Sequence, residues 1–205
     1  HAEDPRLSAG GQASAVPLDA TNEAQAHAFG AHVKKAFGRV DVLFNNAGDM
    51  VARTPLAEVS AAYVRKVLDL NFTSAVLVTK ELLPLIPKGG VIINMASAAA
   101  RDGGGPGAAI YAASKGAVVT LTRAWVNEFA PRDIRVFAVA PGVIDTDFHR
   151  RHSKPELLDQ IARTSPANKH GAPEDVARAV VYLAGEGGGF MTGVTIDING
   201  GRYFA

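Results

Sequence analysis

The chain has 205 residues, of which 47% are hydrophobic and 20% are charged, a composition that is ordinary for a globular protein. It carries 21 basic and 20 acidic residues, so its net charge of +1 provides no bulk attraction to nucleic acid or to an anionic membrane. The absence of cysteine excludes disulfides, thiolate metal sites and thiol nucleophiles. No apolar run approaches the roughly 20 residues that span a bilayer. We therefore expect a cytoplasmic protein that binds neither nucleic acid nor membrane.

The first half of the chain alternates short apolar runs with segments of helical periodicity. A strand is expected over 14–18, followed by a helix over 21–37 for which Thr21 is a candidate N-cap. The next strand covers 40–44, and a long helix with an apolar face follows over 56–84.

The second half continues the same alternation. The run Val91-Ile92-Ile93 is continuously apolar, as in a strand that is buried on both faces. The region 141–171 is expected to be largely irregular. The remaining expected elements, in chain order, are a helix at 109–129, a strand at 134–140, helices at 155–163 and 174–184, and a strand at 194–198.

This order of elements predicts an α/β fold, with a parallel sheet covered by helices on both faces and a single domain over 1–205. Ligands of such sheets bind beyond the carboxyl ends of the strands. Four polar or glycine-containing segments follow expected strands and should lie together at the carboxyl-terminal edge of the sheet: Asp19, Asn45 to Gly48, Ser97, and Pro141-Gly142.

Tyr111 and Lys115 are four residues apart near the start of a helix, so they share one face. The spacing alone is weak, and an exposed helical pair is the alternative. A tyrosine needs roughly 4 kcal/mol to ionise at neutral pH, and an ammonium group at about 4 Å supplies about that much. We therefore expect Lys115 to lower the pKa of Tyr111 and make it a general acid or base.

Two further polar residues have both a structural and a functional interpretation. Ser97 follows the apolar strand and either caps a turn or hydrogen-bonds a substrate oxygen. Asn71 is a poor helix former in the middle of the long helix. It is either a surface residue or the mark of a local distortion that aims a backbone carbonyl at a water molecule.

Taken together, these residues resemble the short-chain dehydrogenase/reductase family. The order and spacing of Asn45-Asn46-Ala47-Gly48, Asn71, Ser97, Tyr111-x-x-x-Lys115 and Pro141-Gly142-Val143-Ile144-Asp145-Thr146 are close to the family's pattern. The C-terminal segments 171–177 and 192–201 are also similar, so the resemblance covers nearly the whole chain. It implies a Rossmann-like, doubly wound fold and an oxidoreductase that uses NAD or NADP to interconvert a secondary alcohol and a ketone.

The resemblance also implies a role for each residue that matches. Tyr111 would exchange the proton with the substrate and contact the cofactor, Lys115 would lower the Tyr111 pKa and hold the nicotinamide ribose, and Ser97 would polarise the carbonyl. Asn71 would position a water molecule in a proton relay. The remaining implied cofactor contacts are Asp19 and Ala20 at the adenine, Asn46, Ala47 and Gly48 at the adenosine ribose, and Pro141, Gly142, Ile144 and Thr146 at the nicotinamide.

One part of the family's pattern does not occur in these 205 residues. The resemblance implies a preceding β-α-β portion with a glycine-rich turn, whose backbone amides bind the cofactor pyrophosphate. We therefore expect the sequence to belong to a longer protein. The residue that distinguishes NAD from NADP would lie in the same portion, so both cofactors remain open.

The resemblance suggests further features around the site. Residues 147–165 would form a lid over the substrate, where Arg150 or Arg151 could meet an anionic group. His149 and His152 lack a carboxylate cluster, which favours a solvated loop over a metal site. The pocket would be lined near Ala98, Asp102, Val143 and Phe148.

The substrate class and the rival functions stay open at this point. Candidate substrates are polyols, sugars, steroids and 3-oxoacyl thioesters. A homodimer or homotetramer is expected, with 56–84 and 109–129 at the subunit interfaces. The rival interpretations are a catalytically inactive nucleotide sensor or interaction protein of the same fold, and, ranked last, a sugar-nucleotide epimerase.

Overall fold

The structure, a computed structural model, describes residues 13–203 and contains a four-stranded parallel sheet. The strands lie in the order β1-β2-β3-β4, so neighbours in the chain are neighbours in the sheet. Val42 pairs with Val91, Val91 with Arg135, and Ala138 with Thr195. The strand bounds are β1 Val42–Asn45, β2 Val91–Met95, β3 Arg135–Pro141 and β4 Thr195–Ile198.

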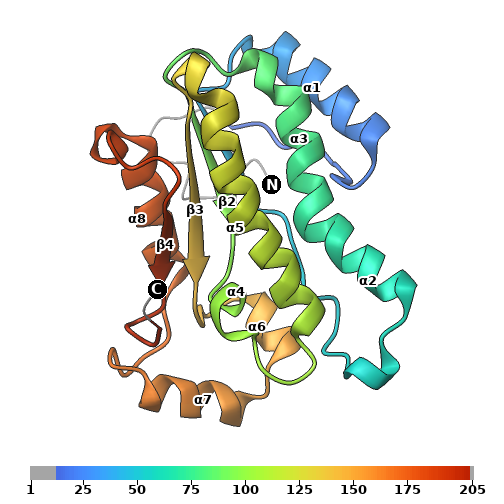
Figure 1. Cartoon of the computed structure of the whole chain (residues 1–205), viewed down its shortest axis with the longest axis vertical. Helices are drawn as coiled ribbons and strands as arrows, with labels where there is room; N and C mark the ends of the chain where they lie inside the picture. The colour runs from blue at the N-terminus through green and yellow to red at the C-terminus, as the bar shows by residue number, and fades with distance from the viewer. Residues whose placement is uncertain (1–12, 204–205) are drawn as a thin grey trace.

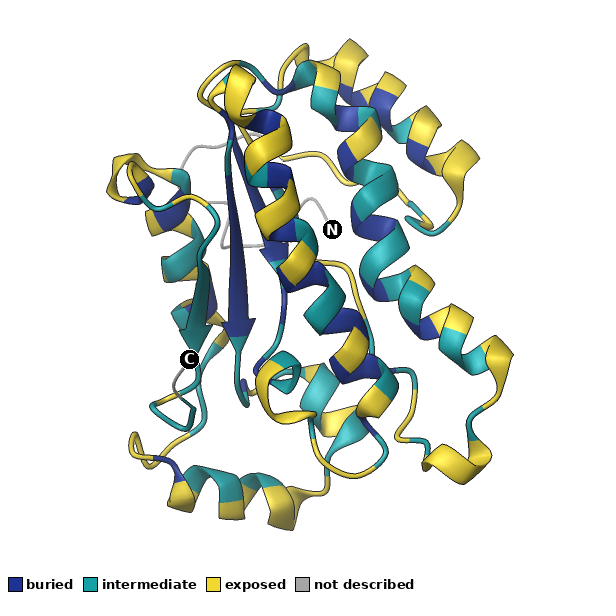
Figure 2. Ribbon diagram, viewed as in Figure 1, coloured by how far each residue is buried: buried dark blue, intermediate teal, exposed yellow. Residues whose placement is uncertain are grey.

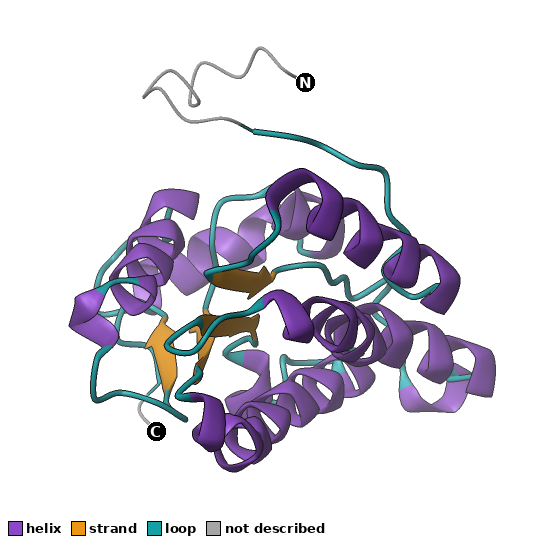
Figure 3. Cartoon of the chain, turned by 90° about the horizontal axis from the view of Figure 1, so that it is seen from above, coloured by secondary structure: helices purple, strands orange, loops and turns teal. Residues whose placement is uncertain are grey.

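Helices cover both faces of this sheet (Figures 1 and 3). On one face lie α3 (Ser74–Leu82) and α5 (Ala109–Phe129), with α1 (Glu23–Phe37) packed beside α3, and on the other lies α8 (Pro173–Ala184). Side chains alternate along the strands, so Ile92 packs with Trp125 while Ile93 packs with Leu183. Figure 2 shows the result, with the central strands β2 and β3 buried between helices whose outer sides are exposed. The predicted α/β class is confirmed.

Shorter helices surround the sheet. They gather mainly beyond the arrowheads of the strands in Figure 1, where the carboxyl ends lie. Among the described residues, no helix is long and apolar enough to cross a membrane. The shorter helices are α2 (Ala61–Leu68), α4 (Ala99–Asp102), α6 (Asp147–His152) and α7 (Pro155–Thr164), with single turns at Leu56–Glu58, Leu83–Leu85, Ala130–Arg132 and Glu186–Gly188.

Two expectations at the N-terminal side are wrong. Residues 14–18 form no strand, because Pro17 lacks an amide proton and none of the described strands pairs with this segment. The N-cap of α1 is Asn22, whose side chain accepts a hydrogen bond from the Gln25 amide, and not Thr21. The Thr21 hydroxyl donates instead to the Asp19 carboxylate at 2.7 Å.

The expected helix over 56–84 is divided. It begins only at Ala61, after the N-cap Ser60. A π-helical turn, Asp69–Thr73, then separates α2 from α3. Asn71 lies in this turn and is 2% exposed, so the distortion predicted from this residue is confirmed and the surface alternative is wrong.

The region 141–171 contains more helix than expected. Besides α7, which matches the predicted 155–163 closely, it contains α6 over Asp147–His152. Its six residues span less than two turns, too few for an apolar periodicity to be recognised in the sequence.

Candidate active site

A cavity of about 810 Å³ opens beyond the carboxyl ends of the strands. Loops after β1, β2 and β3 form its walls, and α6 and α7 contribute to its mouth. Most predicted site residues line it: Asn46, Gly48, Ser97, Tyr111, Lys115, Pro141, Gly142, Ile144 and Thr146. The predicted pocket residues Ala98, Asp102, Val143 and Phe148 line it too.

Ser97 and Tyr111 meet in this cavity. Ser97 follows β2, and its oxygen accepts a hydrogen bond from the Ala99 amide at 3.2 Å, which fixes the turn into α4. Its hydroxyl also lies near enough to the Tyr111 side chain to lower the Tyr111 pKa. Both proposed roles of Ser97, as a turn cap and as a partner of the reacting oxygen, are therefore compatible with one side-chain position.

Lys115 lies one helical turn after Tyr111 and is 2% exposed. Its ammonium group donates to the Met95 carbonyl at 2.8 Å and lies 5.8 Å from the centre of the Tyr111 ring. Burial lowers the pKa of Lys115 to about 8. The helical spacing predicted from the sequence therefore places both side chains on one face, inside the cavity and not on the surface.

The expected fall in the Tyr111 pKa is not seen. Burial raises the pKa of Tyr111 to about 12, the Ser97 hydroxyl opposes the rise, and the charge of Asp49 adds to it. Desolvation is the largest of these causes because Tyr111 is only 7% exposed. The Tyr111 hydroxyl is accordingly protonated at neutral pH.

Asn71 lies directly behind Gly48. Its amide nitrogen donates to the Asp49 carbonyl at 2.7 Å and to the Val67 carbonyl at 2.9 Å. Its side-chain oxygen is buried without a hydrogen-bond partner among the described residues. A β-carbon on Gly48 would lie 2.5 Å from this oxygen and 3.1 Å from the Lys115 nitrogen. Glycine is thus required where the backbone passes these two groups.

Three of the predicted cofactor residues do not line the cavity. Ala47 lies between two lining residues of the loop after β1. Asp19 and Ala20 precede α1, and the exposed Asp19 carboxylate caps its own turn through hydrogen bonds from Thr21, which lower its pKa. The structure therefore places Ala47 beside the site but does not group Asp19 and Ala20 with it.

The arginines of α6 are engaged outside the cavity. Arg150 pairs with Asp145 and Asp147, and Arg151 pairs with Asp49, so the expectation that either meets a substrate within this cavity is not supported. His149 lines the cavity, while the His152 ring binds Asp49. Among residues 13–203, no group of three potential metal ligands occurs.

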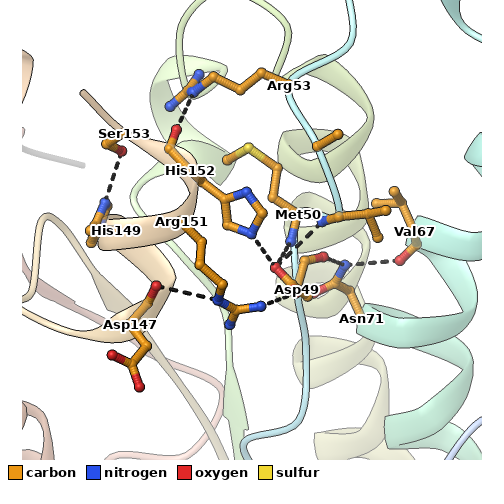
Figure 4. Close-up of polar contacts among 12 residues, drawn as sticks. Asp49, Met50, Arg53, Val67, Asn71, Asp147, His149, Arg151, His152 and Ser153 are labelled. Atoms are coloured by element: carbon orange, nitrogen blue, oxygen red, sulfur yellow. Dashed lines mark hydrogen bonds and ion pairs between the residues drawn. The ribbon is translucent and has the colours of Figure 1, made fainter.

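Two residues of the site were not found by sequence reasoning. Asp49 and Arg53 follow the Asn-Asn-Ala-Gly segment and join it to α6, as Figure 4 shows. Arg53 also lines the cavity. No local spacing marks them, because their partners are about 100 residues away in the chain.

Comparison with known proteins gives concordant results. Residues 3–202 match the model of a family described as enoyl-(acyl carrier protein) reductase. The chain is 34% identical over 200 residues to the uncharacterized oxidoreductase YgfF of Escherichia coli, covering 95% of the chain and 81% of that protein. It is 33% identical to the 3-oxoacyl-[acyl-carrier-protein] reductase FabG of Thermotoga maritima, covering 93% of the chain and 77% of that protein.

Solved structures share a comparable sequence identity with this chain. An NADH-dependent reductase, A1-R′, responsible for alginate metabolism matches with a TM-score of 0.86 and 32% identity, covering 99% of this chain and 83% of that one. A blue fluorescent protein from a metagenomic library, in complex with NADPH, matches with a TM-score of 0.84 and 31% identity, covering 91% and 74%. The chain belongs to the short-chain dehydrogenase/reductase family of oxidoreductases.

Proposed function

We propose that this protein interconverts a secondary alcohol and a ketone by hydride transfer, with Tyr111 as the general acid or base. The observation that supports this most strongly is the meeting of Ser97 and Tyr111 in the cavity, with Lys115 and Asn71 behind them. A substrate oxygen placed between the two hydroxyls would accept hydrogen bonds from both.

The cofactor is NAD or NADP. The lining of the cavity suits the nicotinamide end of the cofactor, because Gly48 and Gly142 present no side chains and Ile144 and Thr146 are among the lining residues. These residues, together with Asn46 and Lys115, would hold the ribose and nicotinamide. When bound, the cofactor supplies or accepts the hydride.

The protein's own residues handle the proton. In reduction, the protonated Tyr111 donates to the developing alkoxide while Ser97 holds that oxygen. In oxidation, Tyr111 must first lose its proton, which the ammonium group of Lys115 and a cationic nicotinamide both favour. The buried oxygen of Asn71, free to accept a hydrogen bond, suits a water molecule that links Lys115 to solvent.

The lining of the cavity includes both apolar and cationic side chains. Phe148, Leu157 and Ile161 come from α6 and α7, while Arg53 and Arg202 lie among the lining residues. This lining favours an apolar carbonyl compound over a polyol. The 3-oxoacyl thioesters, to which the Thermotoga maritima reductase owes its name, are therefore our first candidate class.

Nicotinamide absorbance tests the proposal. The protein is incubated with NADH or NADPH and a panel of ketones that includes 3-oxoacyl thioesters and steroids, and with NAD⁺ or NADP⁺ and the matching alcohols. We expect turnover of at least one pair, and its loss in Tyr111→Phe. Tight cofactor binding without turnover of any pair would favour the rival nucleotide sensor.

We further propose a homodimer or homotetramer in the cytoplasm. Val181 and Tyr182 of α8 and the nearby Phe190 are 71%, 55% and 106% exposed, an apolar surface that a second copy could cover. Leu56, at the start of the region 56–84 expected at an interface, is also 84% exposed. Light scattering at micromolar concentration tests the assembly, and a monomer would contradict it.

A further inference from the structure

Asp49 contacts two elements that are distant in the chain (Figure 4). Its backbone carbonyl accepts the hydrogen bond from Asn71 at 2.7 Å. Its carboxylate accepts hydrogen bonds from the His152 ring at 2.6 Å and from Arg151 at 3.0 Å, both at the end of α6. One residue therefore joins the π-helical turn behind the site to the segment in front of it.

The contact with His152 is the stronger of the two carboxylate contacts. The His152 side chain is 8% exposed and that of Asp49 is 26% exposed, whereas Arg151 is 60% exposed. Solvent screens an exposed pair, but a short hydrogen bond between shielded groups keeps most of its strength. Burial raises the pKa of Asp49, but hydrogen bonds from His152 and the Val51 amide outweigh burial and hold it below its ordinary value. The acceptor is therefore a carboxylate at neutral pH.

A second contact holds the same residue of α6. The Arg53 guanidinium donates to the His152 carbonyl at 2.9 Å, and also to the carbonyls of Gly104 and Pro106 at 3.1 and 3.0 Å. His152 is thus bound at its ring by Asp49 and at its backbone by Arg53. The loop after β1 attaches the end of α6 at two points.

The position of α6 matters for the reacting group. Phe148 lies on α6, one turn before His152, and the centres of these two rings are 5.0 Å apart. On its other side, the Phe148 ring lies 5.6 Å from the Tyr111 ring. A displacement of His152 would therefore move Phe148 and, with it, the Tyr111 side chain, which we propose exchanges the proton.

We propose that Asp49 is a positioning residue that holds α6 over the cavity through His152 and so fixes Phe148 against Tyr111. This inference rests on the proposed function of Tyr111. It assigns the Asp49 side chain no contact with substrate. Its effect is to keep the wall of the substrate site in one place while the reaction proceeds.

Amide hydrogen exchange tests the attachment without any substrate. Peptides covering 147–153 are compared in wild type, His152→Ala and Asp49→Asn, the latter retaining a side-chain oxygen for the Met50 and Val51 amides. We expect exchange about tenfold faster in His152→Ala and several-fold faster in Asp49→Asn, as for the loss of one charge-assisted hydrogen bond. The matched control is Arg150→Gln, which removes a charge of α6 whose ion pairs, among the described residues, are with Asp145 and Asp147. Wild-type exchange in both variants, or equal acceleration in the control, would overturn the proposal.

Kinetics tests the consequence for the reaction. We expect kcat/KM for the substrate to fall about tenfold in Asp49→Asn and His152→Ala, and no further in the double variant. Cofactor affinity, followed by NADH or NADPH fluorescence, should change less than about twofold. Losses that add in the double variant, or wild-type kcat/KM in both single variants, would contradict the inference. If Tyr111→Phe also keeps wild-type turnover, the proposed function fails, while the exchange result remains a separate test of the attachment.

Discussion

Gly48 and Asn71 lie so close together that a β-carbon on Gly48 would be 2.5 Å from the Asn71 side-chain oxygen. That oxygen cannot move aside freely, because the amide nitrogen of the same group donates to two carbonyls, those of Asp49 and Val67. The close approach therefore links the loop after β1 to the π-helical turn, and it gives the first test of the site.

Gly48→Ala should displace the Asn71 side chain and disturb Lys115, whose nitrogen would be 3.1 Å from the new carbon. We expect kcat/KM to fall by about 10- to 100-fold and the free energy of unfolding to fall by about 1–3 kcal/mol. The matched control is Gly116→Ala in α5, where a β-carbon meets nothing within 4 Å and should stabilise the helix by up to about 1 kcal/mol. Wild-type kinetics in Gly48→Ala would show that Asn71 is not needed.

Lys115→Met tests the cost of the buried charge. Since burial lowers the Lys115 pKa from 10.5 to about 8, the unfolded chain binds more protons between these values. The stability contributed by this group therefore falls as the pH drops from 10.5 to 8, by roughly 3 kcal/mol at about 1.36 kcal/mol per pKa unit.

The variant should accordingly be inactive. Its free energy of unfolding at pH 7 should equal that of wild type or exceed it by up to about 3 kcal/mol. Denaturant unfolding at pH 7 and at pH 10 measures this, and the difference should shrink at the higher pH. The exposed Lys66→Met is the control, with an expected change within about 0.5 kcal/mol. A large loss of stability at pH 7 would mean that the bond to the Met95 carbonyl outweighs the burial of the charge.

The two directions of the reaction should differ in their dependence on pH. With a pKa of about 12, Tyr111 is protonated at neutral pH, so ketone reduction needs no change in its state. Alcohol oxidation needs the phenolate, and its kcat/KM should rise by up to about tenfold per pH unit between pH 7 and 9. The Ser97 hydroxyl lowers the Tyr111 pKa, so Ser97→Ala should move the rise to higher pH. An oxidation rate that falls with pH would exclude Tyr111 as the base.

Local patterns predicted the parts of the structure that depend on local forces. The helical spacing of Tyr111 and Lys115 placed them on one face, and α5 begins and ends at the expected residues. The poor helix propensity of Asn71 indicated a distortion, which the π-helical turn confirms. The parallel direction of the strands followed from the alternation of strands and helices, because parallel neighbours require a crossover.

Features that depend on distant partners were not predictable in this way. The strand expected over 14–18 needs a neighbour that the described residues do not provide. The pKa of Tyr111 rises instead of falling, because it depends on how deeply the ring is buried, which the spacing to Lys115 does not reveal. The contacts of Asp49 and Arg53 with α6 join residues about 100 positions apart and leave no periodic signal.

The most direct test of the central claim compares two tyrosines of the same neighbourhood. Tyr111→Phe removes the proposed proton donor, whereas Tyr63→Phe removes a hydroxyl that donates to the Ala52 carbonyl at 2.7 Å and lies outside the cavity lining. We expect steady-state nicotinamide turnover to fall about 10²- to 10⁴-fold in Tyr111→Phe, with cofactor affinity changed far less, and to stay within a few-fold of wild type in Tyr63→Phe. Equal turnover in wild type and Tyr111→Phe would contradict the assignment of Tyr111 as the acid or base.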